Sequence, residues 1–289
     1  HLANALVFIT DKAFVQKLYP SPLALAFIGG ASGAFTFIAF PWLLKPADPP
    51  VIMAAIGAGA VSVPALVYFF TALQRDEVSR VVPAIGSLTP LFTFGLSYAL
   101  LGERLSGEFL VAFIILALGG VLIAFRSFGE LFKKRSYGLF FLEILVAFLF
   151  ALALVLQKFA FEGTDDLSAF LWSRVGALAA ALPLLIRAEV WERLRFSELR
   201  GSGIKTGALY IISRIFAGLS PLIIVLAISL GSASLVNALQ GVQYVFLFAL
   251  AIFFSRRWPD IFKEELNRST LVQKTIATIL IATGLALLV

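Results

Sequence analysis

Ionisable side chains lie inside several of the most apolar segments of this chain, where they can bind an ion or a charged solute. A charge within a bilayer span costs about 2.5–3.5 kcal/mol on insertion scales, so it usually faces a cavity or a partner. Helical rise from one membrane side puts Glu143 and Arg214 at depths of roughly 9 Å and roughly 14 Å. Either they form a structural ion pair, or Arg214 binds a substrate carboxylate or phosphate with Glu143 as counter-ion or proton carrier. The other charges of this kind are Asp11, Lys12 and Arg174.

A polar stripe marks one predicted helix of the second half. Asn237, Gln240 and Tyr244 are spaced at i, i+3 and i+7, which places them on one helical face, with Gln243 beside them. Side-chain amides cannot face lipid without a large cost. The stripe therefore lines either a substrate cavity or a neighbouring helix, and both interpretations stay open.

Two aromatic residues extend the set of substrate-binding candidates. Tyr210 precedes Arg214 by four residues on the same helical face, and Trp172 precedes Arg174 by two. Together they predict a polar and aromatic pocket. Passive roles remain open for Trp172 and Arg174, because residues of these types also anchor spans at the lipid headgroups. Asp11 is a candidate for proton coupling, with helix packing as its alternative.

Four prolines, Pro64, Pro83, Pro90 and Pro221, fall inside predicted helices. A proline frees a backbone carbonyl and permits a bend, which a conformational gate requires. Prolines also occur in membrane helices that do not move, so a gating role and a passive role are both open.

The elements that must position these residues are membrane helices. The chain is 60% hydrophobic and 14% charged, with a mean hydropathy of +0.97, which excludes an ordinary soluble domain. Apolar runs bounded by Pro, Gly and charge clusters predict ten spans and an all-α membrane protein. A short interfacial helix or a solvated loop follows the seventh span, at residues 189–196. The ten predicted spans cover residues 2–18, 22–44, 51–73, 78–101, 107–125, 137–157, 167–187, 205–229, 232–255 and 271–289.

The two halves resemble each other when residue n is compared with residue n + 155, so that Gly86 matches Gly241 and Tyr98 matches Phe253. We therefore expect a first five-helix repeat at residues 1–125, a connecting loop at 126–136 and a second repeat at 137–289. An odd number of spans per repeat forces the halves into opposite orientations, which is a feature of alternating-access transporters. The abrupt start of the first span predicts a helix 1 that is truncated at its N-terminus.

Basic residues indicate the membrane orientation. Of the 23 Lys and Arg residues, 17 belong to odd-numbered connections, 3 to even-numbered ones and 3 to spans. The positive-inside rule therefore predicts that the odd connections are cytoplasmic and the C-terminus is outside. The same topology accounts for the formal charge of +6, so no nucleic-acid partner is expected.

Several chemistries are excluded by what the sequence lacks. It has no cysteine and one histidine, His1, which excludes disulfides, thiolate metal sites and a nucleophile with a histidine base. It also has no H-E-x-x-H metal motif and no G-x-x-x-x-G-K-[ST] nucleotide loop. We therefore expect no enzymatic activity, no metal and no cofactor.

The segment 72–92, with a polar turn followed by Pro90 within the fourth span, is succeeded by a Gly-Glu-Arg turn at Gly102, Glu103 and Arg104. In these features the chain resembles EamA-type members of the drug/metabolite transporter superfamily. With ten spans and a five-plus-five repeat, the resemblance covers essentially the whole chain. The second half keeps the pattern loosely, with Ser255 and two arginines where Gly-Glu-Arg would fall.

The resemblance implies a secondary active transporter, and by family habit an exporter, for a small organic solute such as an amino acid or another metabolite. It implies a central cavity lined by spans 1–4 and 6–9, with spans 5 and 10 as peripheral support. A lipid or lipid-linked-sugar flippase is the alternative, and it predicts a polar groove that opens sideways to membrane lipid. The expected location is the prokaryotic inner membrane. Proton or ion coupling and a homodimer remain open.

Overall fold

The computed structural model describes residues 2–18, 21–101, 108–124, 134–194, 240–262 and 267–287. Within these ranges the chain is helical and contains no strand, which confirms the prediction of an all-α protein. Helices occupy the predicted spans wherever those spans are described. The eighth predicted span, 205–229, and the first part of the ninth lie outside the described residues.

The described part of the first half contains six α-helices, and two of them continue as helices of another type. Helix α1 continues as a π-helix at Phe14–Leu18, and α2 continues through a 3-10 helix at Ser32–Ala39 into α3. The α-helices are α1 (Leu2–Ala13), α2 (Pro22–Ala31), α3 (Phe40–Leu43), α4 (Pro49–Arg75), α5 (Val78–Leu101) and α6 (Glu108–Ala124).

In the second half, α8 continues as a 3-10 helix at Leu182–Ile186. The short α9 lies in the connection where an interfacial helix and a loop were alternatives, and its backbone is helical there. The helices are α7 (Lys134–Gly163), α8 (Asp166–Ala181), α9 (Ala188–Leu194), α12 (Gln240–Arg257), α13 (Pro259–Phe262) and α14 (Arg268–Leu287).

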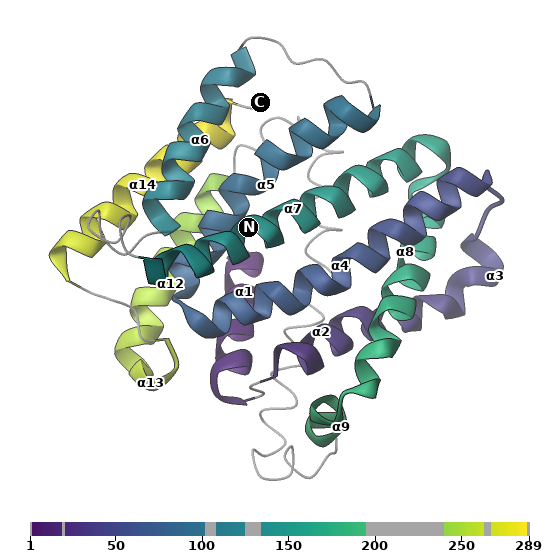
Figure 1. Ribbon diagram of the computed structural model, residues 1–289, viewed down its shortest axis with the longest axis horizontal. Coiled ribbons are helices and arrows are strands. Elements are labelled where there is room, and N and C mark those ends of the chain that lie inside the picture. Colours follow the sequence, from purple (N-terminus) through teal and green to yellow (C-terminus); the bar gives the residue numbers. More distant parts are fainter. Residues whose placement is uncertain are drawn as a thin grey trace.

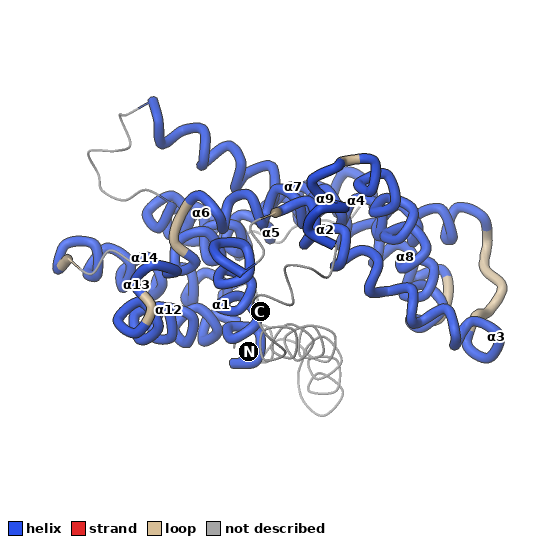
Figure 2. The backbone as a smooth tube through the Cα atoms, turned by 90° about the horizontal axis from the view of Figure 1, so that it is seen from below, coloured by secondary structure: helices blue, strands red, loops and turns tan. Residues whose placement is uncertain are grey.

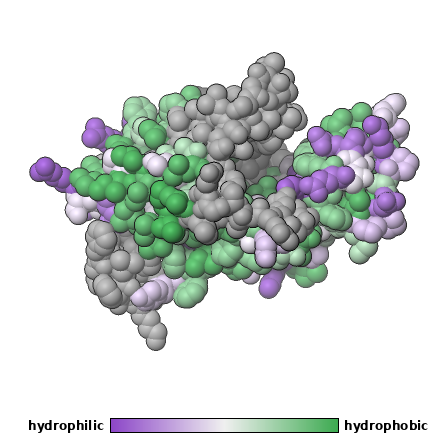
Figure 3. Space-filling model, turned by 90° about the horizontal axis from the view of Figure 1, so that it is seen from above, coloured by the Kyte–Doolittle hydropathy of each residue, from purple (hydrophilic) through white to green (hydrophobic). Residues whose placement is uncertain are grey.

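Five described helices are long and apolar enough to cross a membrane: α4, α5, α7, α14, and α8 together with its 3-10 extension. Large apolar side chains remain on the outer surface, such as Phe35 at 80% exposure and Ile186 at 85%. Figure 3 shows apolar residues spread over much of one face between polar ends. Apolar surface on this scale is stable in contact with lipid, so the chain is an integral, multi-pass membrane protein.

The helices form layered antiparallel and crossing pairs. Figure 1 shows α7 running beside α4 and α6 crossing α14, and both pairs are in contact. In Figure 2, helices α12, α13 and α14 lie at one end of the molecule and α3 and α8 at the other. The main core joins α1, α4, α5 and α7 to α12 and α14.

Two crossings bring helix backbones into direct contact. A Cβ atom added to Gly59 of α4 would lie 1.7 Å from the Ser173 carbonyl oxygen, and one added to Gly176 of α8 would lie 1.8 Å from the Ile56 carbonyl oxygen. No side chain fits in either place. Such contacts are characteristic of membrane helices, where small residues permit close van der Waals packing.

The α6–α14 crossing is reciprocal. A Cβ on Gly119 would lie 2.8 Å from Ile281, and a Cβ on Gly284 would lie 2.7 Å from Leu116. An offset of 165 residues relates Gly119 to Gly284 and Leu116 to Ile281, ten more than the 155 that aligns Gly86 with Gly241, as the longer connection at residues 255–270 requires. The two helices therefore present equivalent surfaces to each other, as two-fold related elements do.

The turn between α7 and α8 is held by Asp165, which caps the N-terminus of α8. Its carboxylate accepts a hydrogen bond from the Ser168 backbone N–H at 3.3 Å and lies 3.9 Å from the Lys45 ammonium nitrogen. Hydrogen bonding from Ser168, assisted by the charge of Lys45, lowers the pKa of this carboxyl below its ordinary value. Ser168 also accepts a hydrogen bond from the Lys45 backbone N–H at 2.8 Å, so this turn is tied to the segment before α4.

Candidate functional site

Seven ionisable side chains among the described residues are buried, and all have 6% exposure or less. Burial of a charge requires a partner, so such residues define the polar interior of the protein. They come from α1, the α4–α5 turn, the start of α5, α7 and α14. They are Asp11, Lys12, Asp76, Glu77, Arg80, Glu143 and Lys274.

The α4–α5 turn positions three of these residues. Because α4 ends at Arg75 and α5 begins at Val78, only Asp76 and Glu77 connect the two helices. The Glu77 backbone N–H donates to an Asp76 carboxylate oxygen at 2.8 Å, which fixes the turn. Arg80 follows one turn into α5 and is completely buried.

Lys12 binds the C-terminal end of α4. Its ammonium group donates hydrogen bonds to the carbonyl oxygens of Leu73 and Asp76, the second at 2.6 Å. The carbonyls at a helix C-terminus carry partial negative charge, so a cation there is stabilising. Lys12 thereby joins α1 to the α4–α5 turn.

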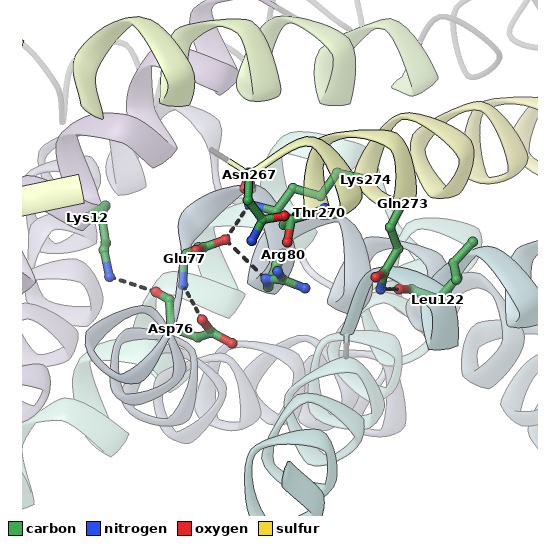
Figure 4. Close-up of polar contacts among 10 residues, drawn as sticks. Lys12, Asp76, Glu77, Arg80, Leu122, Asn267, Thr270, Gln273 and Lys274 are labelled. Carbon is green, nitrogen blue, oxygen red and sulfur yellow. Dashed lines mark hydrogen bonds and ion pairs between the residues drawn. The ribbon is translucent and has the colours of Figure 1, made fainter. Parts of the chain in front are cut away.

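Glu77 is the centre of a second group of contacts, shown in Figure 4. One of its carboxylate oxygens accepts hydrogen bonds from Arg80 Nε at 3.0 Å and from the Lys274 ammonium group. Lys274 also donates to the Ser79 hydroxyl at 2.8 Å. This network, which we call the Glu77 cluster (Glu77, Ser79, Arg80 and Lys274), connects α5 of the first half with α14 of the second.

Two hydrogen bonds hold the first turns of α14, where Lys274 lies. The Thr270 backbone N–H donates to the Asn267 side-chain oxygen at 2.7 Å, which caps the helix. The Gln273 amide donates to the Leu122 carbonyl oxygen of α6 at 2.7 Å. Lys274 is therefore presented to Glu77 by a fixed helix end.

A small polar pocket of about 180 Å³ lies beside the cluster. It is lined by Lys12 and Gln16, by the end of α4 with Asp76 and Glu77, and by Phe262 of α13. A site for a drug-sized ligand occupies about 300–1,000 Å³. The pocket is therefore suited to water and small ions.

Glu143 of α7 lies within the electrostatic reach of this region. Its side chain is fully buried, and neither carboxyl oxygen has a hydrogen-bond partner among the described residues. The charges of Asp76 and Arg80 act on it. The predicted ion pair with Arg214 involves a residue outside the described part of the chain, so it stays a prediction.

Other predicted site residues also lie outside the described ranges or have only their backbone described. The backbone of Gln240 begins α12. Those outside the described ranges are Tyr210, Arg214, Pro221 and Asn237.

The described part of the polar stripe contacts neighbouring helices. The Asn4 amide of α1 donates to the Gln243 side-chain oxygen at 3.2 Å. A Cβ atom on Gly86 of α5 would lie 1.9 Å from the Tyr244 hydroxyl oxygen, so this ring packs directly on the α5 backbone. Gln243 and Tyr244 thus pack α12 against α1 and α5.

Arg174 and Trp172 occupy a separate place, where α8 meets the segment between α2 and α3. The Arg174 side chain covers Gly33, and its guanidinium carbon lies 4.6 Å from the centre of the Phe170 ring. The buried Trp172 indole nitrogen has no hydrogen-bond partner among the described residues. Trp172 contacts the Phe40 ring at a centroid distance of 6.4 Å.

The three described prolines lie inside continuous helices, Pro64 in α4 and Pro83 and Pro90 in α5. Pro83 is buried and lies one turn beyond Arg80. Because proline provides no N–H, it weakens the backbone hydrogen bonding of α5 close to the Glu77 cluster.

Sequence reasoning missed the Glu77 cluster. Arg80 and Lys274 were counted with the basic residues of the connections, and that assignment was wrong for both because they are buried at 0% and 1% exposure. A usable signal existed in the α4–α5 turn. The predicted spans 51–73 and 78–101 are separated by only four residues, which leaves little room for Asp76, Glu77 and Arg80 to reach water.

The arrangement defines an all-helical, multi-pass membrane protein with a buried network of charges between its helices. Residues 2–126 match the model of the EamA-like transporter family, which confirms the resemblance over that range. No curated protein matches the chain.

Proposed function

We propose that the protein is a secondary active transporter that moves a small organic solute by alternating access between two inverted five-helix repeats. The observation that carries this proposal is the Glu77 cluster, which joins α5 of one predicted repeat to α14 of the other. When two rigid halves alternate between conformations, the contacts between the halves on each membrane side must break and form again. A small set of buried ionic contacts is suited to that role.

The energetics of a buried ion pair support a gate rather than a purely stabilising contact. Desolvation of two charges offsets most of their mutual attraction, so the net stability that such a pair contributes is small. When water enters, the separated charges are solvated and the cost of opening falls. The cluster therefore specifies a closed state without making it permanent.

The position of the cluster agrees with the proposed topology. Lys12 lies in the second half of the first span, Asp76 and Glu77 form the third connection, and Lys274 lies near the start of the tenth span, which the ninth connection precedes. All of them are close to odd-numbered connections, which the predicted topology places on one membrane side. By the distribution of basic residues, that side is cytoplasmic.

The reciprocal α6–α14 contact gives independent support for the inverted repeat. These helices correspond to the fifth and tenth predicted spans, which the repeat relates to each other. Equivalent residues, Gly119 and Gly284, make equivalent contacts across the crossing. A pair that packs with local two-fold symmetry is suited to hold the two halves together while they rearrange.

We further propose that the solute bears a carboxylate and that Arg214 binds it, with export as the direction. A ligand at 100-fold its Kd stabilises a protein by about 2.7 kcal/mol. In a thermal-unfolding screen of full-length protein in detergent, amino acids or organic acids should therefore raise the melting temperature. Arg214→Ala should abolish the shift, whereas Arg268→Ala, which removes an exposed arginine, should keep it.

The screen also separates the transporter from the flippase. Stabilisation by lipid-linked sugars alone, with no response to soluble compounds, would contradict the proposal. An undiminished response to an amino acid or organic acid in Arg214→Ala would remove Arg214 from the binding site.

A further inference from the structure

The seven buried ionisable side chains of the described residues do not balance in charge. Four are acids, Asp11, Asp76, Glu77 and Glu143, and three are bases, Lys12, Arg80 and Lys274. With every group ionised, this buried set carries one excess negative charge. An apolar interior stabilises such an excess poorly, so within this described set a proton on one acid is favoured.

Contacts identify which acid is least supported as an anion. Glu77 accepts hydrogen bonds from Arg80 and Lys274, and Asp76 accepts one from the Glu77 backbone N–H. Asp11 also has interactions within the structure. Glu143, fully buried, has no hydrogen-bond donor for either oxygen among the described residues.

Helix α7 packs against α4, α5 and α8, and these helices determine which charges Glu143 meets. Asp76, at the end of α4, repels an anion at this position, and Arg80 of α5 attracts one. The charged residues of α8, Asp166 and Arg174, are not among the groups that act on it. The Arg80 guanidinium group therefore interacts with two carboxyl groups: it is hydrogen-bonded to Glu77, and its charge attracts Glu143 when Glu143 is ionised.

We infer that Glu143 is the proton-binding site that couples a proton to the opening of the Glu77 cluster. With Glu143 protonated, Arg80 stays hydrogen-bonded to Glu77 and the cluster is closed, as observed. When the Glu143 O–H bond breaks and the proton passes to water, the new carboxylate competes with Glu77 for Arg80. Lys274 and α14 are then held less firmly.

This inference rests on the proposed transporter function and adds its coupling ion. Its linkage has a definite sign: the closed state binds the extra proton, so acid favours closure and alkali favours opening.

The first test is infrared spectroscopy of the full chain in phosphatidylcholine vesicles, comparing acid with alkaline pH. We expect a protonated-carboxyl band that disappears at alkaline pH and is absent from Glu143→Gln. Glu162→Gln, which changes an exposed carboxylate on the same helix, should leave the band unchanged. A band that persists in Glu143→Gln, or the absence of any such band in the wild type, would overturn the inference; a permanent Glu143–Arg214 ion pair predicts the latter.

The second test measures opening directly with a maleimide. Thr270→Cys introduces a single thiol one turn before Lys274, at a position that is buried, and exposed Ser269→Cys corrects for the pH dependence of thiol reactivity. Opening linked to one proton should raise the corrected labelling rate by up to about tenfold per pH unit. Adding Glu143→Gln should make the rate independent of pH.

The outcomes distinguish the inference from the function on which it rests. Opening that does not depend on pH, or that keeps its pH dependence in Glu143→Gln, overturns the proton site and leaves alternating access standing. A Thr270→Cys thiol that remains unlabelled under every condition, while Ser269→Cys reacts, contradicts alternating access and the inference together.

Discussion

Lys274→Ala is expected to destabilise the protein by about 3–5 kcal/mol, the cost of removing one partner of a buried ion pair. Lys274 is 1% exposed and donates to both Glu77 and Ser79, so its truncation removes two buried hydrogen bonds together with the charge. The free energy of unfolding in mixed micelles measures the effect. Lys158→Ala is the matched control, because its ion pair with Glu162 is exposed and contributes only about 0–1 kcal/mol.

The double variant Glu77→Gln/Lys274→Met refines this prediction. Removing both charges removes the Glu77–Lys274 pair but leaves the buried Arg80 without the Glu77 carboxylate, so the double variant should recover only part of the stability that Lys274→Ala loses. The Glu77 cluster of this variant should nevertheless lack the ionic contact between residues 77 and 274. Equal destabilisation by Lys274→Ala and Lys158→Ala would show that the buried contact has no special energetic role.

Gly59→Ala should be comparably damaging although it adds one methyl group. The added Cβ would meet the Ser173 carbonyl oxygen at 1.7 Å, and the contacted atom belongs to the backbone of α8, which cannot move aside as a side chain can. Overpacking costs about 1–3 kcal/mol and sometimes more, and we expect at least the upper value here.

Gly57→Ala provides a control on the same helix. Its Cβ would lie 3.5 Å from a Leu156 methyl carbon, an ordinary van der Waals contact, and alanine favours the helix by about 1 kcal/mol over glycine. Gly57→Ala should therefore be neutral or slightly stabilising in the same unfolding assay. If Gly59→Ala behaves like Gly57→Ala, the α4–α8 contact is not as close as described.

The helices were predictable because local signals bound them. Helix α5, Val78–Leu101, coincides with the predicted fourth span, since a charged turn precedes it and the sequence Gly-Glu-Arg follows it. Helix α7 was predicted too short, beginning at residue 137 and ending at 157, whereas it runs from Lys134 to Gly163. Hydropathy locates the apolar section of a helix and is insensitive to polar turns at either end.

The candidate site was predictable only in part. Burial of Asp11, Lys12 and Glu143 follows from their apolar surroundings in sequence, and the structure buries all three. Arg80 and Lys274 lie at helix starts, where local hydropathy is compatible with exposure. Their burial arises from packing between α5 and α14, helices that are nearly 200 residues apart, as in the Lys274–Glu77 contact with its sequence separation of 197.

The central claim is that the Glu77 cluster closes one end of a protein that alternates between two states. Spin labels at exposed positions on the two sides of the cluster, Arg75→Cys and Arg268→Cys, measure that closure in the full-length chain, which has no native cysteine. We predict two distance populations in lipid vesicles and a shift toward the longer one when Lys274→Ala is added. A single population that Lys274→Ala leaves unchanged would contradict the claim.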